Sequence, residues 1–167
     1  MTALEAALSF ALRGFAVLPV RRGTKRPLLR AWPDRASTEP STIRSWFERY
    51  PSAGVGVLAG AKSGIAVLDV ELENLEAFAQ RTARLELPET LQVVSGGGGM
   101  HYYFRIEQEQ RTRRLEGIGD LIGERSYVVA PPSKHGCGDS YEFRAGHSFD
   151  SELALLPQWL EAGDWSL

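Results

Sequence analysis

Apolar residues at helical spacing predict four helices in the chain. Gly14 and Pro51 directly follow two of these segments, and residues of their kind commonly end a helix. Ser41 is placed to cap the second helix with its hydroxyl. The predicted helices cover residues 4–13, 42–50 and 75–85, and a short amphipathic helix interrupted by Pro157 covers residues 151–162.

Short runs rich in valine, isoleucine and aromatic residues predict strands. The second and third runs flank a turn at residues 61–64, so we expect them to form a hairpin or near-hairpin. Because helices and strands are mixed without a repeat or a long linker, we expect a single α+β domain over residues 1–167. The predicted strands cover residues 15–20, 54–60, 64–72, 90–95, 100–106, 120–133 and 140–145.

The composition narrows the possible classes of function. The formal net charge of −2 gives no global positive field, so any contact with nucleic acid must come from local basic groups. The single cysteine, Cys137, excludes an internal disulfide and a Cys-rich zinc cluster. The N-terminus lacks the basic start of a secretory signal, and no apolar run reaches the roughly 20 residues of a membrane span. We therefore expect a soluble, cytoplasmic protein that does not bind membranes.

Two carboxylates, Asp69 and Glu71, stand at the end of an apolar strand-forming run. Side chains two positions apart on a strand share a face, where two negative charges repel each other unless a cation lies between them. Hard divalent cations such as Mg²⁺ bind oxygen ligands of this kind, whereas a strand that ended earlier would leave both acids solvated. A third acid, Asp120, stands just before another β-rich sequence.

Four consecutive glycines, residues 96–99, interrupt strand-forming sequence just before His101. The segment lacks the closing Gly-Lys-Ser/Thr of a P-loop, the helix of a dinucleotide fingerprint and, around Ser95, the frame of a nucleophile elbow. Its backbone N–H groups have no Cβ to obstruct them, so they are able to approach an anion closely. The alternative is a loose hairpin whose histidine finds a partner elsewhere.

The strand after the glycines has two different faces. Met100, Tyr102 and Phe104 form the natural core face. The other face carries His101, Tyr103 and Arg105, which leaves His101 at the open end of the strand, where its imidazole could donate to a phosphate.

Two further segments carry donors suited to phosphate. Ser133, Lys134 and His135 follow two strand-ending prolines and place hydroxyl, ammonium and imidazole groups in one turn. Lys25 lies in a basic loop upstream. An ordinary polar turn and a solvated basic loop are the alternatives.

The order of these segments resembles the bifunctional primase–polymerase domain of the archaeo-eukaryotic primase superfamily, found in replication proteins of plasmids, phages and mobile elements. The resemblance covers about residues 6–143 and depends mainly on SGIAVLDVE, VVSGGGGMHYYF and SYVVAPPSKHG. It implies an α/β lobe packed on an RRM-like antiparallel sheet. It also implies a nucleotidyltransferase that extends a 3′-hydroxyl with dNTPs or NTPs on a single-stranded DNA template.

The resemblance also implies a role for each candidate residue. Asp69, Glu71 and Asp120 would hold two Mg²⁺ or Mn²⁺ ions, and His101 would contact the triphosphate of the incoming nucleotide. The other nucleotide-binding positions that it implies are Lys25, Ser95, Lys134 and His135.

The chain departs from the family pattern after its third acid. Ile122 stands where relatives carry a basic residue, and Arg125–Ser126 replaces a pair of glycines, so Arg125 could supply the missing charge. A helicase or accessory domain, in a longer protein or the same operon, is an expected partner. Two other functions stay open: a non-catalytic nucleotide- or nucleic-acid-binding module of the same fold, and a metal-dependent phosphodiesterase or nuclease that uses the same acids.

Overall fold

The computed structural model of the chain describes residues 1–163 and contains two antiparallel sheets. The helices are α1 (Ala3–Leu12), α2 (Trp32–Arg35), α3 (Pro40–Arg49), the 3₁₀ helix η1 (Leu72–Asn74), α4 (Leu75–Thr82) and α5 (Gln158–Ala162). The strands are β1 (Val17–Val20), β2 (Gly54–Leu58), β3 (Ile65–Val70), β4 (Gln92–Val94), β5 (Met100–Arg105), β6 (Arg113–Leu115), β7 (Gly119–Ile122), β8 (Tyr127–Ala130) and β9 (Glu142–Phe143).

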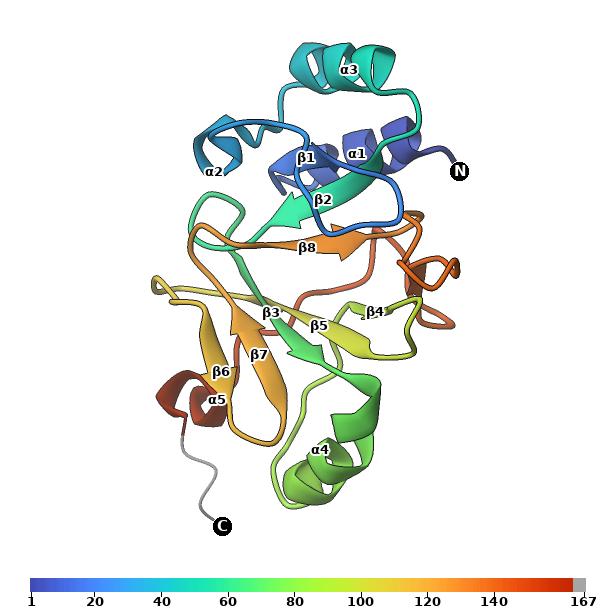
Figure 1. The fold of residues 1–167 in the computed structure, drawn as a ribbon. Coiled ribbons are helices and arrows are strands. Elements are labelled where there is room, and N and C mark those ends of the chain that lie inside the picture. Colours follow the sequence, from blue (N-terminus) through green and yellow to red (C-terminus); the bar gives the residue numbers. More distant parts are fainter. Residues whose placement is uncertain (164–167) are drawn as a thin grey trace.

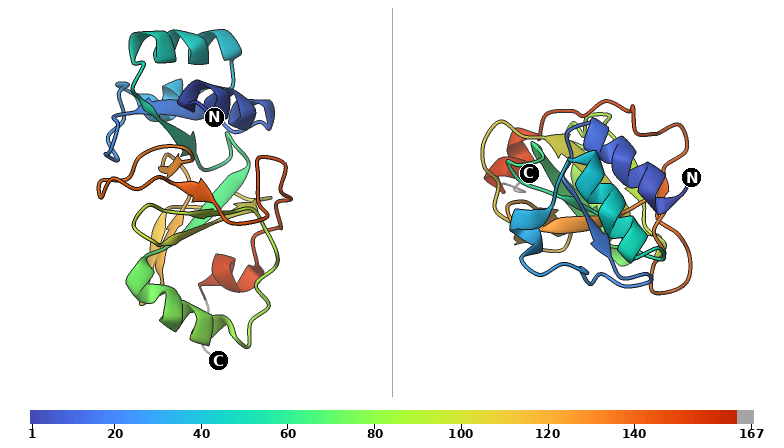
Figure 2. Two further views of the ribbon diagram at one scale, coloured as in Figure 1. Left: turned by 90° about the vertical axis from the view of Figure 1, so that its right-hand side faces the viewer. Right: turned by 90° about the horizontal axis from the view of Figure 1, so that it is seen from above.

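The elements stack in layers along the long axis of the molecule (Figures 1 and 2). Helices α1 and α3 contact each other and lie on a three-stranded sheet with the order β1-β2-β8. A six-stranded sheet with the order β6-β7-β3-β5-β4-β9 follows, and α4 and α5 lie at the far end. Every strand pair is antiparallel, which confirms the predicted α+β class.

Helices α1 and α3 begin with different N-terminal residues. Thr2 and Glu5 form a reciprocal capping box at the start of α1, with the Glu5 N–H donating to the Thr2 hydroxyl at 3.1 Å. Helix α3 begins at Pro40 rather than after Ser41, so the prediction that Ser41 is its N-cap is wrong. Proline is favoured at the first helical position because its missing N–H would have no partner there.

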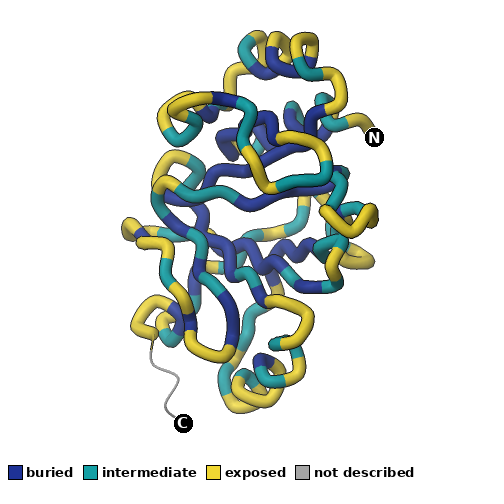
Figure 3. Tube along the Cα trace, in the orientation of Figure 1, coloured by how far each residue is buried: buried dark blue, intermediate teal, exposed yellow. Residues whose placement is uncertain are grey.

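The central strands of the six-stranded sheet are mostly buried (Figure 3), and residues from both of its faces belong to hydrophobic cores. On one face, Tyr103 lies fully buried in the larger core, which the three-stranded sheet and α1 complete. On the other face, Tyr102 and Phe104 pack with Phe78 of α4. The prediction that only one face of β5 belongs to the core is therefore wrong, because alternation cannot identify a strand that is covered on both sides.

Three pairs of consecutive strands belong to different sheets: β2 and β3, β7 and β8, and β8 and β9. The first two of these crossings differ from the sequence prediction. Strands β2 and β3 do not pair with each other, so they form no regular hairpin. Of the expected hairpin or near-hairpin, the structure has the turn at residues 61–64, which an isolated antiparallel bridge between Gly60 and Ile65 closes. The run predicted as one strand over residues 120–133 contains a turn between β7 and β8, which again divides the run between the sheets. Both crossings follow from pairing partners that lie far away in sequence, which a local apolar pattern does not report.

The ends of other elements also differ from the sequence pattern. Helix α4 ends at Thr82, and α5 starts only after Pro157, since residues 151–157 are not helical. Leu155 instead bridges to Arg105 beside β5. The short elements α2 and β6 carry too few apolar residues to give a periodic signal.

Gly119 lets β7 approach β3 closely. A Cβ at this position would lie 1.9 Å from the Asp69 carbonyl oxygen, a distance that the paired backbones cannot accommodate without moving apart. Only glycine therefore fits at this point of the sheet.

We predict that Gly119→Ala lowers the free energy of unfolding by at least about 2 kcal/mol, because overpacking forces the strands to shift. Chemical denaturation would measure the change. The control is Gly136→Ala, where a Cβ would meet nothing closer than 3.5 Å. Equal stability of the two variants would contradict the close approach.

Candidate active site

The register of β3 brings three predicted site residues together. Asp69 pairs directly with His101 of β5 on one side and with Asp120 of β7 on the other. Residues directly opposite each other in an antiparallel pair place their side chains on the same face, with Cβ atoms about 4.5–5.5 Å apart. This face continues the larger core, because Val67 and Tyr103 lie on it beside the site.

Asp69 and His101 form the closest contact of the site. His101 Nε2 lies 3.4 Å from Asp69 Oδ1, and the two side chains are only 6% and 19% exposed. Burial of the carboxyl opposes its ionisation, but the His101 imidazole and the more distant Lys25 charge outweigh this effect and hold the pKa of Asp69 below its ordinary value. The other ring nitrogen, His101 Nδ1, is buried and has no hydrogen-bond partner among residues 1–163.

Asp120 is the more accessible of the two paired acids. Its side chain is 38% exposed, and its Oδ1 lies 3.8 Å from an Arg114 guanidinium nitrogen on β6. Like charges directly opposite each other destabilise a sheet. Here each carboxylate has its own basic neighbour, His101 for Asp69 and Arg114 for Asp120.

A cavity of about 200 Å³ adjoins these side chains. Its walls come from the six-stranded sheet, from β8 and from two connecting segments. Its lining residues are Lys25, Asp69, His101, Ile122, Tyr127, Val128, Val129 and Tyr141. Burial raises the pKa of Tyr127 to about 12. Burial, followed by the charges of Asp69 and Glu71, also raises the pKa of Tyr141 to about 12, so both phenols stay protonated at neutral pH.

Tyr127 positions the loop that carries Lys25. Its hydroxyl donates to the Lys25 carbonyl oxygen, and its ring meets the Trp32 ring edge-on with centroids 4.9 Å apart. Lys25 itself is exposed at the cavity. Its ammonium therefore contributes positive charge to the entrance while its backbone is held by β8.

The glycine run forms a tight turn that Ser95 closes. The Ser95 N–H donates to the Gly99 carbonyl at 2.9 Å, and the Gly99 N–H donates to the Ser95 hydroxyl at 3.0 Å. The Gly98 N–H is bonded to the Ser95 carbonyl. Within the described part of the chain, the N–H groups of Gly96 and Gly97 have no such partner, so they are the two that remain for an anion.

The turn at residues 135–139 packs directly on the glycine turn. A Cβ at Gly96 would lie 2.4 Å from the His135 Cβ and 2.8 Å from the Asp139 carbonyl oxygen. The glycine run thus serves close packing at this position. The Tyr141 ring stands between two imidazoles, with its centroid 5.8 Å from that of His101 and 5.7 Å from that of His135. Ser95 and His135 therefore lie beside the same region as the paired acids.

Three residues from the sequence interpretation lie outside this group. Glu71 is exposed one residue beyond the end of β3. Lys134 lines a separate pocket together with Arg22. Arg125 does not replace the missing basic residue at the cavity, because its guanidinium pairs with Asp34 of α2 at 3.0 Å.

Sequence reasoning missed Tyr141, Tyr127 and Arg114. The two tyrosines belong to strand-forming runs in which an aromatic residue usually signals core packing, so no local pattern distinguishes them. Arg114 lies on a short edge strand that the pattern did not predict. Strand pairing of Arg114 with Asp120 is the signal that identifies it.

The two carboxylates suit a divalent cation whose remaining ligands come from water and a substrate. No three His, Cys, Asp or Glu side chains within residues 1–163 are gathered as a complete metal site. Mg²⁺ is usually held by one or two carboxylates, while waters and substrate phosphates supply its other ligands. Asp69 and Asp120, opposed on neighbouring strands, fit that arrangement.

The match to a known family covers nearly all of this architecture. Residues 7–159 match the family Prim-Pol, described as bifunctional DNA primase/polymerase, N-terminal. The chain belongs to this family. Membership implies primase/polymerase chemistry, with DNA and nucleotides as substrates, and the family generally uses divalent metals. No curated protein matches the sequence, and none of the described helices is long and apolar enough to cross a membrane.

We predict that His101→Leu raises the pKa of Asp69 in the metal-free protein, because the buried carboxyl loses its basic partner. A depressed pKa stabilises the fold above the unfolded-state pKa, and this contribution is lost as the pH falls through the folded-state value. The variant should therefore lose less stability in acid than the wild-type protein does.

Carbon-13 NMR of the aspartate carboxyls would follow both titrations. The control is Asp34, whose pKa is lowered by Arg125 and should not change in the variant. An Asp69 pKa that is the same in both proteins would show that His101 does not set it.

Proposed function

We propose that this domain catalyses metal-dependent, template-directed nucleotidyl transfer from a dNTP or NTP to a 3′-hydroxyl. The observation that supports this most directly is the pairing of Asp69 with Asp120 and His101 beside a cavity, in a chain of the primase/polymerase family. Replication of a plasmid, phage or mobile element is the proposed setting, and single-stranded DNA is the proposed template.

Asp69 and Asp120 are the proposed metal ligands, and Glu71 would join them from the position directly after β3. Two bound Mg²⁺ or Mn²⁺ ions would lower the pKa of the attacking 3′-hydroxyl and neutralise the charge on the leaving pyrophosphate. The low pKa of Asp69 keeps its carboxyl ionised, and therefore ready to bind a cation, at neutral pH.

The nucleotide triphosphate is proposed to lie at the cavity entrance between Lys25 and the glycine turn. Lys25 supplies an exposed ammonium, and His101 contributes its imidazole from the cavity wall while holding Asp69 in place. The free N–H groups of the turn that Ser95 closes are oriented by close packing, so anion binding there would need little ordering. His135 adds a further donor, and Lys134 would act from its neighbouring pocket.

Two other functions use the same residues and remain experimentally separable. A non-catalytic module would bind dNTP in a metal-dependent manner by calorimetry without any synthesis. A phosphodiesterase or nuclease would shorten a labelled DNA strand in the presence of Mn²⁺. An accessory or helicase domain, in a longer protein or encoded nearby, would then act as a partner for a primase/polymerase.

Removing either paired carboxylate should abolish most synthesis. For Asp69→Asn and Asp120→Asn we expect kcat for primer extension with Mg²⁺ or Mn²⁺ to fall by about 10²-fold or more, since stabilisation of transition-state charge is lost. The matched control is Glu76→Gln, which neutralises an exposed acid on α4. Full activity of Asp69→Asn alongside an active wild-type protein would exclude the proposed metal site.

Lys25 should affect nucleotide binding more than catalysis. Lys25→Ala is expected to raise KM for the nucleotide by about tenfold, because a charge-assisted contact to phosphate contributes about 1.5–3 kcal/mol. Steady-state primer extension measures KM and kcat separately. The control is Lys62→Ala. The Lys62 ammonium donates to the Asp34 carbonyl oxygen at 3.0 Å, and Lys62 does not line the cavity. Equal KM values for both variants would contradict this role.

A further inference from the structure

The positive charge of the chain is concentrated in one segment. Residues 21–49 contain eight of the 19 Lys and Arg residues but only three of the 21 Asp and Glu residues. The remainder of the chain therefore has eleven basic and eighteen acidic residues. A net charge of −2 conceals a locally basic surface that is built by the β1–α2 loop, α2 and α3.

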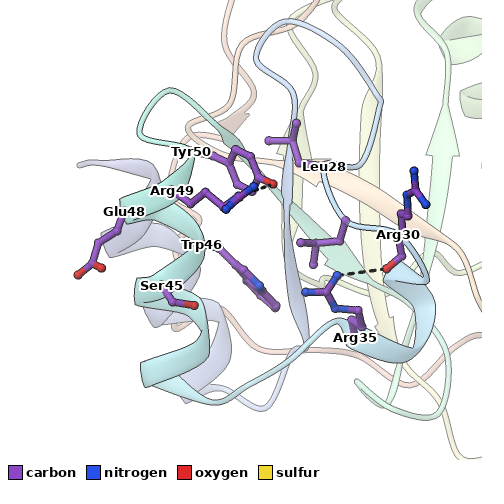
Figure 4. A pocket seen from close by; sticks show the side chains of 9 residues that line it. Leu28, Arg30, Arg35, Ser45, Trp46, Glu48, Arg49 and Tyr50 are labelled. Atoms are coloured by element: carbon purple, nitrogen blue, oxygen red, sulfur yellow. Dashed lines mark hydrogen bonds between the residues drawn. The ribbon is translucent and has the colours of Figure 1, made fainter.

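Part of this segment lines a large open groove of about 850 Å³ (Figure 4). One side carries Arg30 and Arg35, and the other carries Arg49 and Tyr50 at the end of α3. Trp46 forms the floor between them. The groove therefore combines three exposed guanidinium groups with the half-buried Tyr50 ring, above a Trp46 side chain that is only 6% exposed.

The arginines of the groove are available for an external anion. Within residues 1–163, no ion pair joins Arg30, Arg35 or Arg49 to a carboxylate. Glu48 is the only acid of the lining, and it points away from the guanidinium groups. Arg49 is held against Tyr50, with its Nε donating to the phenol oxygen at 3.1 Å and its guanidinium carbon 5.5 Å from the ring centroid.

Grooves that combine cations with aromatic rings suit single-stranded nucleic acid, because the cations bind phosphates and the rings stack with bases. One loop links the groove to the candidate active site. Lys25 lines the cavity beside Asp69, and the same loop reaches the groove at Leu28. A strand bound in the groove would thus contact the loop that also borders the cavity.

We propose that the groove formed by Arg30, Arg35, Trp46, Arg49 and Tyr50 binds a segment of single-stranded DNA and so holds the template. This proposal rests on the proposed function, which requires a template strand. It explains how a chain with net negative charge binds DNA: the acidic remainder repels the strand, and the basic segment confines it to one surface.

The test is fluorescence anisotropy of a labelled oligothymidylate with the whole chain in EDTA and without nucleotide, so that metal and triphosphate play no part. Arg35→Glu and Arg49→Glu should each weaken binding about eightfold or more at about 50 mM salt, and the slope of log affinity against log salt should fall by about 0.7 for each phosphate that the variant no longer binds. Arg49→Lys keeps the charge and should keep most of the affinity.

The matched control is Arg84→Glu, the same charge change at an exposed residue just beyond α4, at the other end of the molecule. Thermal unfolding would establish that all variants fold. Equal affinities of Arg35→Glu, Arg49→Glu and Arg84→Glu would overturn the proposal. Duplex DNA that binds as tightly as the oligonucleotide, and whose binding also depends on the groove arginines, would overturn it too. So would Arg35→Glu and Arg49→Glu variants that lose dNTP binding but still bind the oligonucleotide.

This binding assay tests DNA binding in the groove separately from nucleotidyl transfer at the cavity. Asp69→Asn should bind the oligonucleotide as the wild-type protein does, because Asp69 lies outside the groove. Groove-dependent binding without any synthesis would contradict the proposed function and support the groove. If the protein synthesises DNA but its affinity for the oligonucleotide does not depend on Arg35 and Arg49, only the proposal about the groove would be contradicted.

Discussion

Strand β3 lies between β5 and β7 in a register that sets Asp69 opposite both His101 and Asp120. This pairing concentrates two carboxylates on a sheet face that also carries the core residues Val67 and Tyr103. The charges are tolerated because His101 and Arg114 each lie beside one acid. Under the proposed function, the same unfavourable proximity of two carboxylates would be relieved by a divalent cation bound between them.

Both sheets contribute residues to the candidate site. The chain crosses between the sheets from β2 to β3, from β7 to β8 and from β8 to β9. The crossing from β7 to β8 places Ile122 and Tyr127 on adjoining walls of one cavity. Tyr127 in turn holds the backbone of the loop that carries Lys25. An acidic sheet face and a basic loop therefore meet only because the strands are divided between two sheets.

The sequence pattern predicted these elements better than it predicted their partners. Nearly every strand could be found from a run of β-branched and aromatic residues, and the order of motifs indicated Asp69, His101 and Asp120. The division into two sheets could not be found in this way, since fully buried strands such as β2 look alike whichever strand they pair with.

The side chains that the sequence did not place correctly share one physical cause. Alternation places Tyr103 on the open face because it assumes that one side of a sheet meets solvent, whereas β5 is covered on both sides. Arg125 looks free to serve the site in the sequence, but Asp34, about ninety residues earlier, pairs with it. Tyr141 contributes to the site only through its position between His101 and His135. Each depends on contacts between distant segments, which local sequence does not encode.

The central claim is that Asp69 and Asp120 together hold the catalytic metal. Crystals grown with Mn²⁺ and a non-hydrolysable nucleotide, measured for anomalous scattering at the manganese edge, test it directly. We expect a manganese peak bound by both carboxylates, with the triphosphate on its open side towards Lys25. A manganese peak elsewhere in the protein, with none at Asp69 and Asp120, would contradict the claim.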